Sequence, residues 1–195
     1  FGAGCVDTCD PLDWFEFLGF WFAQGYAGIY SRKDCDGLAY RLTLTHRASD
    51  EDYVHDLLER VGFEYGVQPK PGCLDFRIST ASDDVKEIIK ELVSYGKATT
   101  KAIPQYVKDA PKEHITAFLV GFQRGDGVHK KCKNSVDRLY SSSKRLINDL
   151  HELIIKSGRS ARLTKAHDGG TMQISAEHPV YVTQPHYVLT IRQPK

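Results

Sequence analysis

The sequence predicts an α+β fold made of two quasi-equivalent halves, and three observations lead to that prediction. A nine-residue motif occurs twice, at residues 17–25 and 119–127, so that the two copies lie 102 residues apart. Several segments alternate apolar and polar residues, which is the period of a half-buried strand, and others repeat apolar residues at helical spacing. These strand-like and helix-like segments follow each motif in the same order, which indicates an internal repeat.

The first half is predicted to contain helix, two strands, helix, two strands and helix. A proline at position 11 followed by acids signals a helix start before the first motif. Gly62 is placed to end the second helix. The expected elements after the motif are strands at 27–32 and 38–45, a helix at 49–61, strands at 63–65 and 74–79, and a helix at 83–95.

The second half is predicted to repeat this αββαββα order without a complete final helix. Pro111 starts the helix that carries the second motif, and Gly158 ends the helix that follows it. The expected elements after the second motif are strands at 128–131 and 138–140, a helix at 142–155, and strands at 161–165, 172–176 and 187–192. We expect a first half at residues 1–97, a linker at 98–110 and a second half at 111–195.

Alternation in the strands predicts a sheet with one apolar and one polar face. The residues expected to pack against helices are Leu42, Leu44, Phe76, Ile78, Leu139, Leu163 and Ile174. Those expected to face outward are Arg41, Thr43, Asp75, Arg77, Arg138, Tyr140, Arg162, Gln173 and Ser175. Such a face has the donors and acceptors that read base edges in a major groove. An ordinary solvated sheet face is the alternative, and the repeated motif weighs against it.

The composition bounds the possible functions. The formal net charge is only +1, but acids concentrate on the predicted helices and basic residues on the predicted strands. The 5 cysteines show no paired metal-ligand spacing, which favours thiols in a reducing, intracellular compartment over zinc or disulfides. The longest apolar run is too short to cross a bilayer, so no membrane partner is expected. No phosphate-binding loop of the Gly-x-x-x-x-Gly-Lys type occurs.

The two motifs place a glycine within each apolar helix and a polar residue at its end. Gly19 and Gly121 each cost about 1 kcal/mol of helix propensity, which close approach of two backbones would explain. If the helices cross there, Gln24 and Asp126 emerge side by side. Paired acids at such a point can hold a divalent metal, and the carbonyls of the preceding residues, Ala23 and Gly125, would add oxygen ligands.

Both segments resemble the LAGLIDADG (dodecapeptide) motif of homing endonucleases, particularly of the intein-encoded type. Residues 100–104, Thr-Lys-Ala-Ile-Pro, match the Lys-x-Ile-Pro element found before the second motif in such proteins. Residues 142–146, with the pattern that continues through Leu150, Leu153 and Gly158, resemble the helix found after it. The resemblance covers essentially the whole chain.

The resemblance implies a saddle of antiparallel sheets over DNA and cleavage of both strands at a long, specific site with Mg²⁺ or Mn²⁺. By position, Asp126 matches the second motif's acid and Lys101 matches the first catalytic lysine. The second basic residue is expected at Lys195, with Arg192 and Lys165 as alternatives. The implied protein is a monomer with internal pseudo-two-fold symmetry. Its expected DNA-binding residues are Arg32, Arg41, Thr43, Arg77, Lys131, Arg138, Tyr140, Arg162, Lys165, Gln173 and Arg192.

Gln24 departs from this pattern, because family members carry Asp or Glu at that position. A neutral amide brings no charge to a metal, so we expect double-strand cleavage to be crippled and DNA binding to survive. Natural decay of a mobile element and a deliberate Glu-to-Gln change both remain open. The residues at the two ends of the sequence are not those of a splicing intein, so we expect a free-standing enzyme or an excised endonuclease domain. The alternative functions are a non-catalytic DNA-binding relic and an RNA-splicing maturase.

Overall fold

The structure is a computed structural model that describes residues 9–32, 37–127, 137–172 and 181–192. Its first half contains a four-stranded antiparallel sheet in the order β1-β2-β4-β3. A 3-10 turn at Ala48–Asp50 leads into the second helix. The elements are α1 (Pro11–Gln24), β1 (Gly25–Ser31), β2 (Leu38–Arg47), α2 (Glu51–Val61), β3 (Tyr65–Lys70), β4 (Cys73–Ile78) and α3 (Asp83–Ser94).

The second half contains a three-stranded antiparallel sheet in the order β5-β9-β6 and a two-stranded ribbon of β7 and β8. A short helix, α4 (Gln105–Lys108), lies between the halves. The remaining elements are α5 (Lys112–Asp126), β5 (Arg138–Ser141), α6 (Lys144–Lys156), β6 (Ser160–His167), β7 (Gly170–Met172), β8 (Tyr181–Thr183) and β9 (His186–Arg192). In the part of the second half that the structure describes, no helix corresponds to α3.

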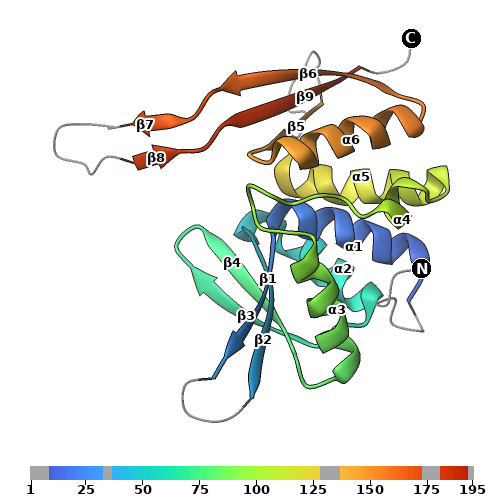
Figure 1. The fold of residues 1–195 in the computed structure, drawn as a ribbon. Coiled ribbons are helices and arrows are strands. Elements are labelled where there is room, and N and C mark those ends of the chain that lie inside the picture. The colour runs from blue at the N-terminus through green and yellow to red at the C-terminus, as the bar shows by residue number, and fades with distance from the viewer. Residues whose placement is uncertain (1–8, 33–36, 128–136, 173–180, 193–195) are drawn as a thin grey trace.

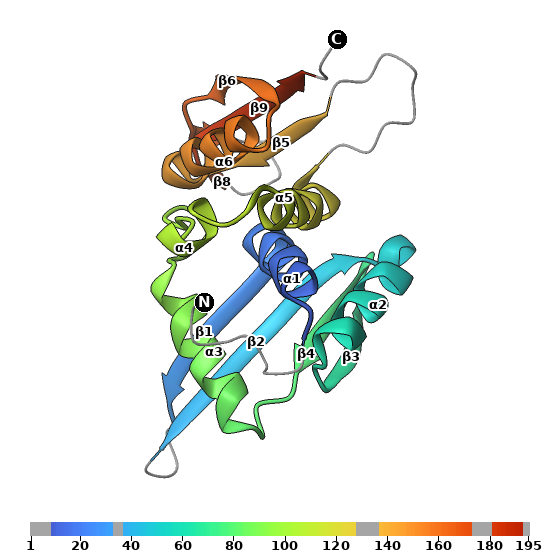
Figure 2. The ribbon, with the colours of Figure 1, turned by 90° about the vertical axis from the view of Figure 1, so that its right-hand side faces the viewer.

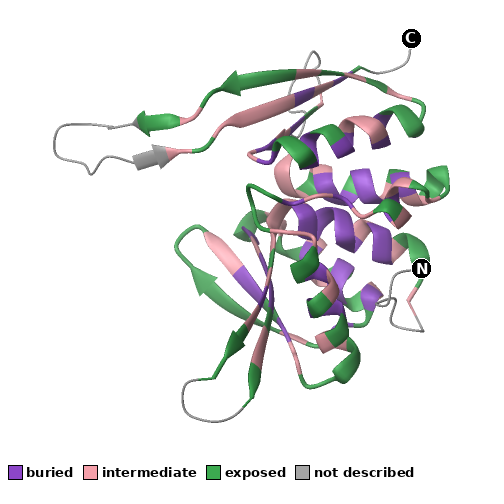
Figure 3. Cartoon of the chain, in the orientation of Figure 1, coloured by how far each residue is buried: buried purple, intermediate pink, exposed green. Residues whose placement is uncertain are grey.

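The two motif helices form the centre of the molecule. Figures 1 and 2 show α1 and α5 side by side, with the first-half sheet and the second-half sheet on either side of the pair. Buried residues concentrate on these two helices and on the surfaces that face them (Figure 3). The largest buried side chains include Trp21, Phe17, Phe20, Phe118 and Phe122. The predicted α+β fold with antiparallel sheets is therefore confirmed, and its core joins the two motif helices.

Several predicted elements differ from those observed. The strand expected at 63–65 begins at Tyr65 and runs to Lys70, and it tolerates Pro69 because β3 is the edge strand of its sheet. The helix α4 was not predicted within the linker, and neither was the short strand β8. The strand expected at 172–176 is described only at Met172, where β7 ends. The strand expected at 128–131 lies outside the described residues, as do Gln173, Ile174 and Ser175.

Among the residues that the structure describes, the predicted inner face is confirmed, and two residues of the predicted polar face are buried. The five apolar residues from Leu42 to Leu139 on the inner face are all at most 5% exposed, and Leu163 is half-buried against the core. Thr43 and Asp75 were expected to be exposed on the polar face, but they are 5% and 2% exposed. Asp75 is covered because Thr45, Lys70 and Arg77 converge on its carboxylate. Thr43 is flanked by Tyr26 on β1 and Arg77 on β4.

None of the helices in the described residues combines the length and the hydrophobicity that a bilayer crossing requires.

Candidate active site and nucleic-acid interface

The motif helices cross at their glycines. A β-carbon built on Gly19 would lie 1.9 Å from the backbone oxygen of Phe118, and one built on Gly121 would lie 1.9 Å from that of Glu16. No side chain fits at such a distance, so only glycine permits this crossing. The close approach inferred from the sequence is thus present, and it offsets the cost of two helical glycines through packing along the interface.

The crossing brings the last residues of both helices together. Each helix ends at a glycine in nearly the same extended conformation, with φ −92° and ψ 152° at Gly25 and φ −92° and ψ 154° at Gly127. The Nε2 atom of Gln24 donates hydrogen bonds to a carboxylate oxygen of Asp126 at 2.8 Å and to the carbonyl oxygen of Gly125 at 3.1 Å. The polar residues of the two motifs are therefore in direct contact.

Lys101 reaches the end of α1 from the linker. Its ammonium group donates to the carbonyl oxygens of Trp21, Phe22 and Gly25 at 3.0–3.1 Å, and it lies 4.3 Å from the centre of the Trp21 ring. Carbonyls in the last turn of a helix have no partner within the helix, and that end carries partial negative charge. The last turn of α1 has no basic residue of its own, so Lys101 supplies the cation from outside the helix.

Comparison with known proteins identifies the architecture. No family model and no curated protein matches the sequence, but solved structures do match. A variant of I-DmoI bound to its nicked target DNA with Mn has a TM-score of 0.64 and 14% identity, over 93% of this chain and 89% of that one. The complex of I-DmoI with DNA and Ca gives 0.62 and 15%, over 93% and 83%. I-DmoI is described as a homing endonuclease.

The N-terminal LAGLIDADG domain of DUF199/WhiA matches as well, with a TM-score of 0.53 and 8% identity, over 95% of this chain and 77% of that one. The chain has the LAGLIDADG fold. At these identities the likeness establishes the fold, and the chemistry is argued from the residues of this chain.

Burial shifts the pKa values of the two ionisable groups at this site, Lys101 and Asp126. Burial lowers the pKa of Lys101 to about 8, although nearby Asp126 opposes the shift. Burial likewise raises the pKa of Asp126 to about 6, against the effects of Lys101 and of the Gln24 hydrogen bond. Between these values Asp126 is an anion and Lys101 is a cation. Both line a cavity of about 400 Å³ beside Gln24, which Ser141 and Ser142 also border.

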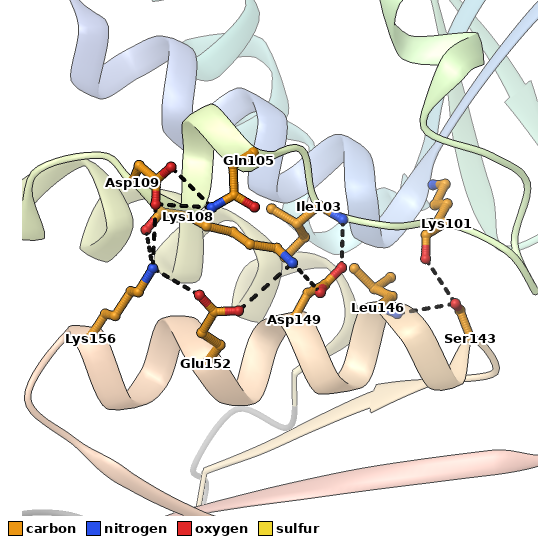
Figure 4. A network of polar contacts seen from close by, with 10 residues as sticks. All are labelled: Lys101, Ile103, Gln105, Lys108, Asp109, Ser143, Leu146, Asp149, Glu152 and Lys156. Carbon is orange, nitrogen blue, oxygen red and sulfur yellow. Dashed lines mark hydrogen bonds and ion pairs between the residues drawn. The ribbon is translucent and has the colours of Figure 1, made fainter.

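The helix α6 and its capping residue hold the linker at Lys101 and at Ile103, two residues later (Figure 4). The Ser143 hydroxyl donates to the carbonyl oxygen of Lys101 at 2.8 Å and caps α6 by accepting from the Leu146 amide. Asp149 accepts from the amide of Ile103 at 2.9 Å and also pairs with Lys108. Sequence reasoning did not assign a role to either residue, although a buried acid within an apolar helical pattern was a usable signal at Asp149.

The donors at the helix ends do not fit a divalent cation held between them. Asp126 supplies the one carboxylate, and the Gln24 amide nitrogen occupies the position that faces both this carboxylate and the Gly125 carbonyl. In the described residues, no group of three His, Cys, Asp or Glu side chains is arranged so that it could hold a metal ion. Ala23 lies at the same junction, because a β-carbon on Gly125 would be 2.4 Å from that of Ala23. At the ends of the two motif helices, the hydrogen bond from Gln24 to Asp126 therefore occupies the place where a metal was expected.

The predicted DNA-binding residues are placed in three groups. Those that are exposed are Arg32, Arg41, Arg77, Arg138, Arg162, Lys165 and Arg192. Two are covered, with Thr43 buried and Tyr140 half-buried and stacked on His186. Lys165 pairs with Asp168. Lys131 and Gln173 lie outside the described residues, as does Lys195, the expected second basic catalytic residue, so their roles stay predictions.

Proposed function

We propose that the chain binds duplex DNA at a long, specific site and that metal-dependent cleavage of both strands is impaired in it by Gln24. The contact between Gln24 and Asp126 carries the proposal. It places the two motif positions together at the junction of the halves, where paired acids would flank a phosphodiester bond. In this chain one of the two positions is a hydrogen-bond donor, so the charge needed to hold Mg²⁺ or Mn²⁺ is halved.

Two further observations support DNA as the ligand. Several of the I-DmoI structures with a similar fold are complexes with DNA in the presence of Mn or Ca. The strands of this chain also carry exposed arginines, while the acids of the described residues, apart from the buried Asp75, lie on helices or in loops. Arginine guanidinium groups bind phosphate and read guanine edges, so such a sheet face is suited to duplex DNA.

Selection and cleavage of a randomised duplex library tests this proposal. The chain as given and its Gln24→Glu variant are incubated with the library in Mg²⁺ and in Mn²⁺, and bound and cleaved duplexes are sequenced separately. We expect both proteins to select the same site and the variant alone to cleave both strands. Asp126→Asn, introduced into the Gln24→Glu background, is the control and should abolish cleavage while leaving binding in place.

Three results would contradict the proposal in different ways. Efficient double-strand cleavage by the chain as given would show that Gln24 does not impair the site. Selection by both proteins without cleavage by either would leave a DNA-binding protein and remove the catalytic assignments. Preference for structured RNA over the selected duplex in a competition assay would favour the maturase alternative.

A further inference from the structure

An acid is buried on the otherwise basic face of the first-half sheet. Asp75, in the central part of β4, is 2% exposed although it points away from the helices. Its carboxylate accepts from the Thr45 hydroxyl at 2.7 Å and lies 3.1 Å from the Lys70 ammonium and 3.2 Å from Nε of Arg77. Covered in this way, Asp75 has no free oxygen with which to read a base. Asp75 instead holds the side chains of Thr45, Lys70 and Arg77 in place.

Arg77 is held by this carboxylate at one edge of its guanidinium and open at the other. The contact to Asp75 is made through Nε, and half of the Arg77 side chain remains exposed. Its two terminal nitrogens make no hydrogen bond to any residue that the structure describes. On the adjacent strand β3, the residue paired with Arg77 is Gly66, where an added β-carbon would meet nothing within 4 Å. The two terminal nitrogens are therefore available to a ligand, because Nε alone is used by the contact to Asp75.

The same part of the sheet is hollowed. Arg77 lines a depression of about 480 Å³ together with Arg41, Thr43 and Tyr30. Arg41 differs from Arg77, because it lies opposite Gly28 on β1 and has no carboxylate partner in the described residues. An arginine that is anchored at Nε loses less conformational entropy on binding than an unanchored one. Its two parallel donors match the O6 and N7 acceptors of guanine.

We propose that Arg77, anchored by Asp75, recognises the O6 and N7 edge of one guanine in the major groove of the bound duplex. The inference rests on the proposed DNA-binding function and names the base that this position selects. Asp75 is a positioning residue, because it acts through Arg77. Arg41, which lacks such an anchor, provides a matched comparison of equal charge on the same face.

Selection from a randomised duplex library by the full chain, Arg77→Ala and Arg41→Ala tests the assignment. The wild-type protein is expected to require guanine at one position. Arg77→Ala should lose that requirement and bind the selected site about 10- to 100-fold more weakly. Arg41→Ala removes the same charge from the same face and should weaken binding, but it should keep the requirement for that guanine. Thermal unfolding of each variant confirms that it folds.

Replacement of that guanine by 7-deazaguanine gives a second readout. The missing N7 acceptor should weaken binding of the wild-type protein and leave Arg77→Ala unaffected. Asp75→Asn should reduce the preference for guanine without reducing affinity for random duplex, since the variant loses a negative charge and keeps Arg77. Retention of every base preference by Arg77→Ala would overturn the inference, although DNA binding would stand. Absence of duplex binding by the wild-type protein would instead remove the proposed function.

Discussion

Gly19 and Gly121 occupy equivalent positions in the helix crossing, each pressed against the backbone of the opposite helix. The oxygens they face belong to Phe118 and Glu16, which are themselves related by the repeat, and both built β-carbon distances are 1.9 Å. Because backbone rather than a flexible side chain lies opposite, a methyl group at either position forces the helices apart. The equivalence predicts that the two glycines contribute equally to stability.

Gly19→Ala and Gly121→Ala should each lower the free energy of unfolding by about 2 kcal/mol or more. Overpacking of a close interface typically costs roughly 1–3 kcal/mol and occasionally more, and a backbone oxygen at 1.9 Å places both sites at the upper end of that range. About 2 kcal/mol or more therefore remains after the gain of about 1 kcal/mol in helix propensity. For a chain of this size the midpoint of thermal unfolding should fall by about 4–8 °C. Gly66→Ala is the control, since its β-carbon would meet nothing within 4 Å. Unchanged melting of either helix variant would contradict the crossing.

The sequence was sufficient to predict what depends on periodicity and on the repeat. The constant offset between the motifs placed Gly19 opposite α5 and brought Gln24 to Asp126, because a glycine in an apolar helix has few explanations other than close packing. Strand alternation correctly assigned the inner face, since burial there follows a period of two.

The sequence was not sufficient where side chains from separate elements converge. Alternation assigned Asp75 to the polar face but gave no sign that Lys70 and Arg77 would cover it. The linker offered Lys101 as a catalytic candidate, yet its three carbonyl partners belong to the end of a helix and to its capping residue, about 80 positions earlier in the chain. Such contacts require a long side chain to adopt one particular rotamer, and the local sequence pattern does not determine which rotamer that is.

Ser143 is predicted to keep Lys101 in its buried position. Ser143→Ala removes the hydrogen bond to the Lys101 carbonyl and the cap of α6, which should cost about 1–2 kcal/mol of stability. A less tightly held Lys101 becomes more hydrated, so its pKa should rise from about 8 toward its ordinary value. Titration of the Lys101 side chain by NMR measures this shift, which a purely structural loss elsewhere would not produce.

The adjacent Ser142 serves as the control for that prediction. Its hydroxyl makes a weaker contact of 3.4 Å to the Ala98 carbonyl, at an exposed position. Ser142→Ala should therefore leave both the stability and the pKa of Lys101 nearly unchanged. Equal effects of the two serine variants would show that Ser143 has no special role.

Asp126 is predicted to make the folded protein less stable as pH rises from about 4 to 6. Its pKa is about 6 in the folded state, whereas an unperturbed aspartate has a pKa of 3.8, so in this window the folded state binds the proton that the unfolded state has lost. Stability therefore falls with rising pH, by on the order of 2–3 kcal/mol in total from this group. Other acids contribute slopes of their own, so the measured quantity is the difference between the wild-type protein and Asp126→Asn. A difference that does not change between pH 4 and 6.5 would contradict the burial of this carboxylate.

Gln24→Glu is predicted to convert the junction of the motif helices from a metal-independent contact into one that depends on a divalent cation. A carboxylate in place of the amide faces Asp126 at hydrogen-bond distance, so one of the two acids must keep a proton or bind a cation. At pH 8 without metal, the variant should lose on the order of 2 kcal/mol of stability. Ca²⁺ at about 100 times its dissociation constant should return about 2.7 kcal/mol, which raises the melting midpoint by about 5 °C or more. The wild-type protein should show no such response.

Gln24→Met is the matched control, because it also loses the hydrogen bond but offers no charge, and Ca²⁺ should not restore its stability. If Ca²⁺ stabilised the wild-type protein and the Gln24→Glu variant equally, the amide would not be filling the place of a cation.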